Sequence, residues 1–200
     1  WATSFQDRQV NILNGATLTV SVPMALDTVM MEEDAQVVFT ATEGKLTARS
    51  LRFAPLLSAT GWKAFGMPFT SAVIKNSTEE EISAPSTQNV DNGIWFARLK
   101  DNKTPEFVVD ESAFGMAGLW AANGDTYTIS SEGAFEFKTL EEPAAPTETG
   151  TFLMCSNPNT FTITLKQSAY ILTTDGTSFE QEANPEIKPF QSFVLTDAKT

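Results

Sequence analysis

Among the 25 acidic residues of this chain, five are available for acid–base chemistry in pairs: Glu106, Asp110, Glu111, Asp125 and Glu136. Glycoside hydrolysis needs two such acids about 5–10 Å apart, one to protonate the leaving group and one to act as base or nucleophile. An acidic chain also offers pairs of this kind on its solvated surface without any catalytic role. A small carbohydrate-active hydrolase that uses paired carboxylates is therefore the alternative hypothesis for this protein.

Other catalytic and metal-binding chemistry has little support. The chain has no histidine, which removes the commonest general base and the usual zinc and copper ligand. Its single cysteine, Cys155, excludes a disulfide within the chain and lies in the apolar run 152–155, where we expect a small buried hydrophobe. Asp and Asn residues such as Asp175 cluster at turns without forming the pattern of an EF-hand loop. We predict no enzyme activity, no cofactor and no metal site.

Three aromatic residues, Trp95, Trp120 and Tyr127, are candidates for ligand binding because exposed rings can stack on sugars. Trp120 lies in residues 118–124, which have glycine at both ends and no clean strand period. This pattern predicts a loop with the ring of Trp120 exposed, as part of a weak glycan-binding surface. The alternative interpretation is that all three rings belong to the core.

Composition and charge limit the partners. Hydrophobic residues make up 42% of the 200 residues, enough for a core, and charged residues make up 19%, too few for a disordered acidic chain. The net charge of −12 argues against nucleic acid and against anionic lipid. No apolar stretch approaches the roughly 20 residues that span a bilayer, so we predict no membrane insertion by this segment. Because the chain starts at Trp1, we expect a mature or shortened form of a longer precursor.

A repeat dominates the first quarter of the chain. Residues 10–20 align with residues 29–39 at an offset of 19, so that Val10 matches Val29 and Leu18 matches Val37. A repeat of about 20 residues with period-two alternation is typical of stacked β-coils. We predict a short β-coil (solenoid-like) segment over residues 1–57. A plain antiparallel meander with a chance echo is the alternative.

The rest of the chain predicts antiparallel strands. Many short alternating segments are separated by turn signals such as Asn123-Gly124 and Asp175-Gly176. This spacing is typical of a β-sandwich or jelly-roll-like unit, which we place at residues 58–200. The fold class is therefore all-β, either as two domains or as one continuous domain.

Segments at both ends of this second part resemble a known group of proteins. Gly61-Trp62-Lys-Ala-Phe-Gly-Met-Pro68-Phe69 is similar to a segment that follows β-coils in surface and secreted proteins of Bacteroidetes, where turns like 14–19 precede it. Residues 187–193 resemble their closing strands, although Gln191 and Ser192 depart from the common pattern, and so do residues 151–153. The resemblance implies an exported, cell-surface or outer-membrane-associated or extracellular module. It implies no activity and no ligand residues.

Four further expectations concern single residues. Phe69 and Phe190 each follow a proline at a strand end, and we expect both to be buried in the same core. Trp62 is expected to fill the join between the coils and the sandwich. Asp27-Thr28-Val29 resembles the acceptor pattern for O-glycosylation in that phylum, which predicts a modified Thr28 exposed between two coils.

These observations lead to a non-catalytic surface module as the main hypothesis, structural or adhesive or with weak glycan binding. Its partner would be a glycan or another surface protein. A purely structural stalk or capping domain of a longer surface protein is a further alternative.

Overall fold

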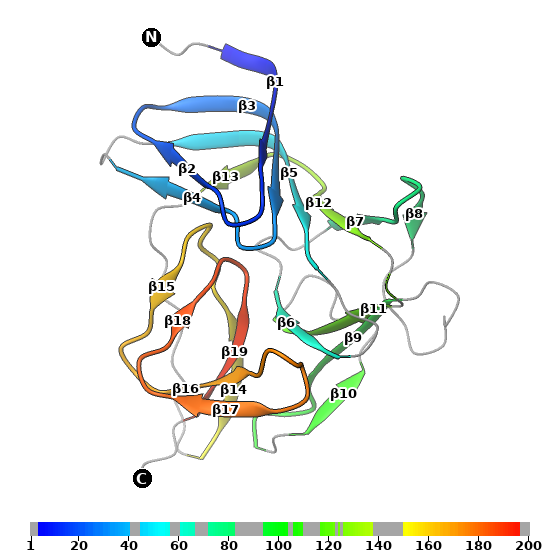
Figure 1. Ribbon diagram of the computed structural model, residues 1–200, viewed down its shortest axis with the longest axis vertical. Coiled ribbons are helices and arrows are strands. Elements are labelled where there is room, and N and C mark those ends of the chain that lie inside the picture. Colours follow the sequence, from blue (N-terminus) through cyan, green and yellow to red (C-terminus); the bar gives the residue numbers. More distant parts are fainter. Residues whose placement is uncertain are drawn as a thin grey trace.

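The protein is all-β in the computed structural model (Figure 1). The structure describes residues 4–40, 45–56, 61–66, 72–82, 94–103, 106–109, 117–122, 124, 126–137 and 150–196. No helix occurs within these ranges, so none of them holds a helix that could cross a membrane. The strands form several sheets, mostly antiparallel, and no closed barrel is made by the described strands.

Long and short strands alternate at the start of the chain: β1 (Ser4–Ile12), β2 (Thr17–Val20), β3 (Met24–Glu32), β4 (Gln36–Phe39) and β5 (Leu46–Ala54). The long strands β1, β3 and β5 pair in parallel in one sheet, and β2 and β4 pair in parallel in another. Val10 lies opposite Val29 and Leu18 opposite Val37, which confirms the alignment seen in the sequence. An antiparallel meander is wrong for these five strands, termed the coil below.

The two turns from a long to a short strand share one backbone conformation. Gly15 has φ of 70° and Asp34, its equivalent 19 residues later, has φ of 58°. Glycine adopts this left-handed conformation freely and aspartate tolerates it, so both sequences can make the same turn. Each long strand and the short strand that follows it are called one layer of the coil. The first two layers are joined at this corner, where the N–H of Gly15 donates to the carbonyl of Glu33 at 3.3 Å.

The sheet of long strands continues beyond the coil. It takes in β7 (Ala72–Lys75), β8 (Glu81–Ile82), β12 (Thr128–Ser131) and β13 (Phe135–Phe137). Strands β12 and β13 both pair antiparallel with β5, and the strand order is β1-β3-β5-β12-β7-β8. This large sheet therefore crosses the predicted boundary between residues 57 and 58. The division into two domains stays a prediction.

Two further sheets and a small pair complete the described fold. The middle sheet has the order β10-β9-β11-β6 and the C-terminal sheet has the order β14-β19-β16-β17, while β15 pairs with β18. In Figure 1 the coil lies at the top, the C-terminal sheet at the lower left and the middle sheet at the lower right. Their strands are β6 (Lys63–Phe65), β9 (Ile94–Leu99), β10 (Phe107–Val109), β11 (Gly118–Ala122), β14 (Phe152–Ser156), β15 (Ile163–Thr164), β16 (Ala169–Leu172), β17 (Phe179–Glu182), β18 (Glu186–Ile187) and β19 (Ser192–Thr196).

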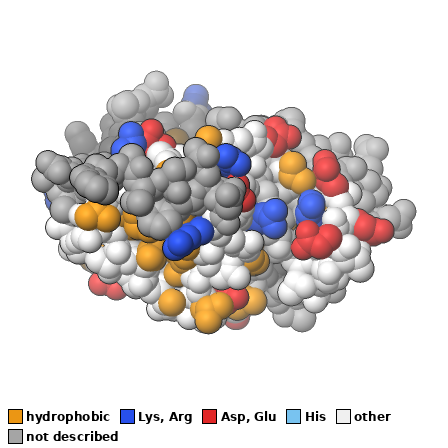
Figure 2. Space-filling view, turned by 90° about the horizontal axis from the view of Figure 1, so that it is seen from above, with side chains coloured by type: hydrophobic (Ala, Val, Ile, Leu, Met, Phe, Trp, Pro, Cys, Tyr) orange, Lys and Arg blue, Asp and Glu red, His pale blue; other side chains and the backbone are white. Residues whose placement is uncertain are grey.

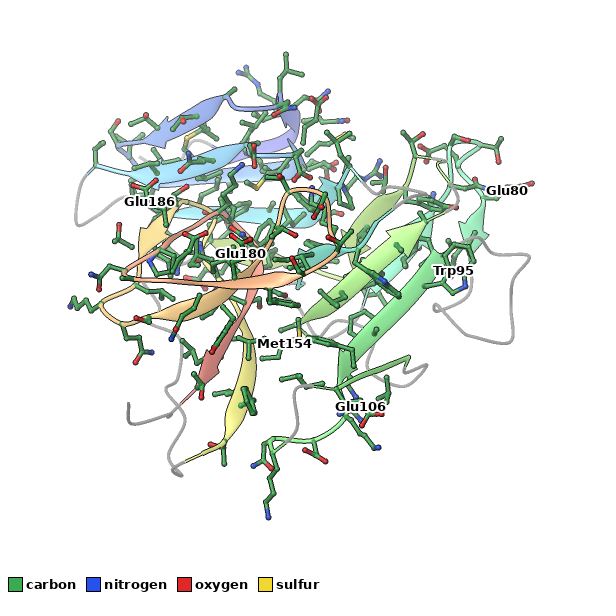
Figure 3. The ribbon with its side chains drawn as sticks, turned by 60° about the horizontal axis from the view of Figure 1, so that its bottom comes forward. Glu80, Trp95, Glu106, Met154, Glu180 and Glu186 are labelled. Atoms are coloured by element: carbon green, nitrogen blue, oxygen red, sulfur yellow. The ribbon has the colours of Figure 1, made fainter. Side chains whose placement is uncertain are left out.

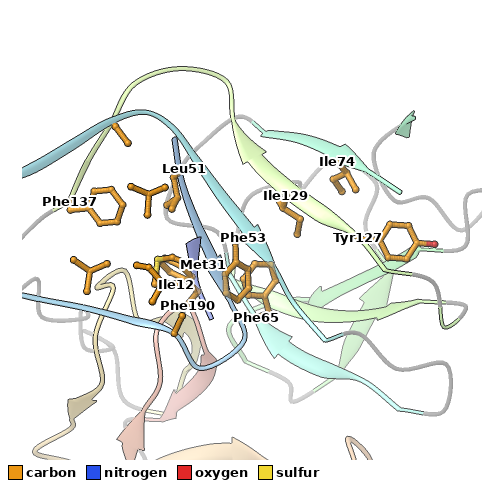
Figure 4. Close-up of a cluster of buried hydrophobic side chains, with 14 of the residues drawn as sticks. Ile12, Met31, Leu51, Phe53, Phe65, Ile74, Tyr127, Ile129, Phe137 and Phe190 are labelled. Atoms are coloured by element: carbon orange, nitrogen blue, oxygen red, sulfur yellow. The ribbon is translucent and has the colours of Figure 1, made fainter. Parts of the chain in front are cut away.

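Three phenylalanines join the coil to the other sheets (Figure 4). Phe53 of β5 stacks on Phe65 of β6 with ring centroids 5.0 Å apart, and Phe190 meets Phe53 edge-on at 5.2 Å. All three are buried in one hydrophobic cluster. The burial of Phe190 is therefore confirmed, whereas Phe69 lies outside the described residues.

Trp62 does not fill this join, and that prediction is wrong. Side chains alternate along a strand, so Phe65 points to the core while Trp62 and Ala64 share the opposite face of the middle sheet. Trp62 is half-buried there, against a small cluster that includes Ala64 and Leu119. Phe65 takes the place that we expected for Trp62.

Buried amide groups hold the C-terminal loops to one another. Asn157 is fully buried, and its Nδ2 lies 2.9–3.0 Å from the carbonyl oxygens of Phe161, Ile187 and Lys188. Its Oδ1 accepts from the backbone N–H and the side-chain amide of Asn159 at 2.9 and 2.8 Å. One side chain thus satisfies backbone groups of two loops that are far apart in the sequence.

Candidate functional site

The ring of Trp120 is fully buried, so the prediction of an exposed loop is wrong. Residues 118–122 form β11, between β9 and β6 in the middle sheet. The indole Nε1 donates to the carbonyl of Phe65 at 3.1 Å, and the ring packs edge-on against Phe65 and Phe96. Gly118 suggested a loop, but it serves close packing, because a Cβ there would overlap the ring of Phe96.

Tyr127 and Trp95 occupy different environments. Tyr127 is 3% exposed and belongs to the main hydrophobic cluster, so its ring is not available for stacking on a sugar. Trp95 is half-buried on β9, opposite Ala121 of β11, which is also half-buried. Of the three predicted ligand-binding residues, the structure leaves one, Trp95, with part of its ring at the surface, and it does not bring the three together.

Trp95 stands at the end of a half-exposed apolar face of the middle sheet. Beyond Trp95 this face is covered by Met154, Leu172 and Phe179 of the C-terminal sheet. At the far end Phe107 stacks on Phe179 with centroids 5.4 Å apart. Figure 3 shows Trp95 well away from Met154, which lies where the two sheets meet. A flat ring held on a rigid strand could contact a sugar face.

Thr28 does not lie between coils. It is in the middle of β3, which pairs with β1 on one side and β5 on the other, and it is 7% exposed. Its hydroxyl lies 3.4 Å from the carboxylate of Asp27. The expectation that a turn exposes Thr28 for O-glycosylation is therefore wrong, because the parallel register places this residue inside a three-stranded stack.

The two candidate acids that the structure describes lie on different sheets. Glu106 forms an ion pair with Lys100 at 3.0 Å beside β10 of the middle sheet. Glu136 forms one with Lys45 at 2.7 Å on the large sheet. Each of these acids is exposed and has its own lysine, and they lie on different sheets. Asp110, Glu111 and Asp125 lie outside the described residues.

The single thiol is a poor nucleophile in this setting. Cys155 is half-buried on β14, opposite Phe193 of β19, and packs against the C-terminal apolar cluster. Burial raises the pKa of the thiol to about 11, because the thiolate would lose its hydration. Thiolate is the reactive form, so Cys155 acts here as a small packing residue.

The carboxylate of Asp175 stabilises the turn in which it lies. Its carboxylate accepts hydrogen bonds from the hydroxyls of Thr173 and Thr177 at 2.6 and 2.9 Å, and from the N–H of Thr177. These hydrogen bonds hold the pKa of Asp175 below its usual value. Within the described ranges, no group of three or more Cys, Asp or Glu side chains gathers where a metal could bind.

The open end of the coil, formed by β1 and β2, is an exposed feature of the described residues that the candidate residues did not include. Leu13 and Val22 are 60% and 59% exposed at the two turns of its first layer. Figure 2 looks down on the coil end of the molecule, where hydrophobic side chains gather at the lower left of the view. A sequence signal was present, because residues 9–22 contain no charged side chain and no proline in an otherwise acidic chain.

Comparison of the chain with protein-family models, with curated proteins and with solved structures found no match.

Proposed function

We propose that this chain is a non-catalytic structural or adhesive module of a bacterial cell surface. The observation that supports this proposal is that several buried polar groups form hydrogen bonds within the protein and so stabilise its fold. The indole N–H of Trp120 donates to a backbone carbonyl, the amide of Asn157 joins two loops, and the hydroxyl of Ser192 accepts from the N–H of Gly118 at 3.2 Å. Buried groups that are saturated in this way stabilise a unique structure.

The packing of the segments that resemble Bacteroidetes surface proteins supports this proposal. The N–H of Trp62 donates to the carbonyl of Gly176 at 3.3 Å, and the N–H of Gly66 to that of Phe190 at 2.8 Å. A Cβ on Gly176 would overlap the backbone of Trp62, so this turn requires glycine. Residues that are distant in sequence thus pack together as one unit. Fractionation of the native host tests export, because recovery in the cytosol alone would contradict it.

We also propose that the coil is a short solenoid-like stack leading into a sandwich of the remaining sheets. Its parallel, in-register layers support this, since each layer covers the apolar side chains of the next. A direct test inserts a second copy of residues 10–28 after Thr28. A solenoid-like coil accepts the extra layer and keeps a cooperative unfolding transition, whereas loss of folding would reject the interpretation.

A weak glycan contact at Trp95 is the second candidate function, supported by its half-exposed ring on a rigid strand. Stacking on one or two sugars would give a Kd of about 10⁻⁴–10⁻³ M. Titration of tryptophan fluorescence with a panel of polysaccharides tests it, with Trp95→Ala as the variant and Trp62→Ala as the matched half-buried control. Equal binding by Trp95→Ala and the unmodified chain would reject the contact.

The same polysaccharides test the paired-carboxylate alternative. Release of reducing ends by the unmodified chain, and its loss in Glu106→Gln, would establish a hydrolase and overturn the non-catalytic proposal. We expect no release, because Glu106 and Glu136 lie on different sheets and each is paired with a lysine.

A further inference from the structure

The coil ends in two strand edges that no described residue pairs with. β1 pairs with β3 alone and β2 with β4 alone, so both outer edges belong to the first layer of the coil. The corresponding edges of the inner strands are covered by other parts of the chain. The edge of β4, for example, is bonded by residues 160–162, where the N–H of Val37 donates to the carbonyl of Thr160 at 2.7 Å. Unpaired N–H and C=O groups along an edge are a template for another strand.

The opposite edge of the large sheet is protected in the usual ways. β8 is two residues long, and glutamates occupy positions 79, 80 and 81. Short edges with charge on them resist pairing with other chains. The first coil layer has no such protection from Gln9 to Val22, which lack both charge and proline. The bulge between Phe5 and Gln9 interrupts β1 only before this stretch.

Burial differs between the first and second layers at two of their equivalent positions, whereas Ile12 and Met31 are both buried and Val20 is more buried than Phe39. Val29 and Val37 are fully buried in the second layer, whereas Val10 and Leu18 are half-buried in the first. A neighbour on the open end would complete the cover of Val10 and Leu18. Together with Leu13 and Val22, they make this end more apolar than an ordinary edge.

Charge favours the same end for contact between copies. The chain carries −12, but residues 4–24 hold one acid and one base, Asp7 and Arg8. Two copies repel over most of their surfaces and meet at lower electrostatic cost along this segment, where the nearby acid Glu32 accepts from the N–H of Asn14 at 3.0 Å. A second copy also has the right chemistry, since it presents the same uncharged strand edge, unpaired among the described strands, and two such edges can pair antiparallel about a two-fold axis.

We propose that the open end of the coil binds a second copy of this chain through a two-fold contact. β1 of one copy pairs antiparallel with β1 of the other, and the exposed Leu13 and Val22 corners are covered in the contact. A two-fold arrangement uses the same patch on both copies, so it closes as a dimer. This inference rests on the coil alone and is independent of glycan contact at Trp95.

Sedimentation velocity from about 1 µM to about 500 µM protein tests the dimer, because a contact this small is expected to be weak. Leu13→Asp and Val22→Asp should each raise the dimer Kd by about tenfold or more. Leu56→Asp is the matched control, since Leu56 is also 60% exposed but follows β5 in the third layer. It adds the same charge and should leave the Kd unchanged within about twofold.

Two further measurements sharpen the result. Raising the salt from about 20 mM to about 500 mM should strengthen association by screening the net charge. Amides of residues 9–12 should exchange more slowly with deuterium at high protein concentration. A monomer throughout the range, equal weakening by Leu56→Asp, or protection confined to another surface would overturn the proposal. Open-ended growth would overturn the two-fold arrangement, because it requires head-to-tail stacking.

Discussion

The coil and the C-terminal region hold together in different ways. In the coil, Val29, Met31 and Val37 are buried between neighbouring layers that repeat the same apolar positions. In the C-terminal region the apolar cluster is smaller, and buried polar groups such as Asn157 and Asn159 join its loops. A repeated layer can thus be stabilised by nonspecific apolar contact, whereas irregular loops need hydrogen bonds with defined partners.

Phe190 tests whether the two regions depend on one another, and it carries the largest expected effect. It belongs to a C-terminal turn but packs on Phe53 of the coil. Its φ of 60° is unusual for a bulky residue and is held by hydrogen bonds to Asn157 and Gly66. Phe190→Ala should lower the free energy of unfolding by about 3–5 kcal/mol in urea denaturation. A loss below about 1 kcal/mol would mean that the regions are stabilised independently.

Asn157 tests how much buried hydrogen bonds contribute to the stability of the C-terminal region. Asn157→Ala removes the side-chain donor to the carbonyls of Phe161, Ile187 and Lys188, of which Lys188 keeps the N–H of Gln191. We expect a loss of about 3 kcal/mol in the free energy of unfolding. Asn159→Ala is the milder control, because the side chain of Asn159 donates to Asn157 rather than to these carbonyls. Equal small losses in both variants would show that the amide network contributes little.

Valines at equivalent positions of successive layers test how much apolar packing contributes to the stability of the coil. Val29→Ala should cost about 2 kcal/mol, because the residue is fully buried. Val10→Ala, at the same position of the open layer, should cost under about 1 kcal/mol in dilute protein. Thermal or urea unfolding measures both. If the proposed dimer forms, the cost of Val10→Ala should rise with protein concentration.

Cys155 gives the smallest effect, which appears at high pH. Its folded pKa of about 11 lies above the ordinary value, so the folded state keeps the thiol proton longer than the unfolded state. The contribution of Cys155 to the free energy of unfolding should therefore be constant below about pH 9 and fall between about pH 9 and 11. Cys155→Ser should remove this part of the pH dependence. Fast reaction of the native thiol with a disulfide reagent at pH 8 would contradict the raised pKa.

The sequence predicted the coil better than the candidate site. Period-two alternation and the offset of 19 residues are local signals, and they determined the all-β class and the alignment of Val10 with Val29. Trp120 was misjudged because Gly118 looked like a loop signal. Thr28 was misjudged because the length of β3 was not visible in the pattern. Both errors concern exposure, which depends on what packs against a residue.

The sequence by itself determined the all-β class, the apolar alternation, the matching turns at Gly15 and Asp34, and the uncharged stretch 9–22. These properties follow from residue types within about twenty positions of one another. Only the tertiary structure decided that Trp120 is buried against Phe65, that Asn157 links distant parts of the C-terminal region, and that β1 and β2 each pair with one strand among the described residues. The physical reason is that burial and edge exposure depend on contacts between distant segments, and a single sequence does not show which segments meet.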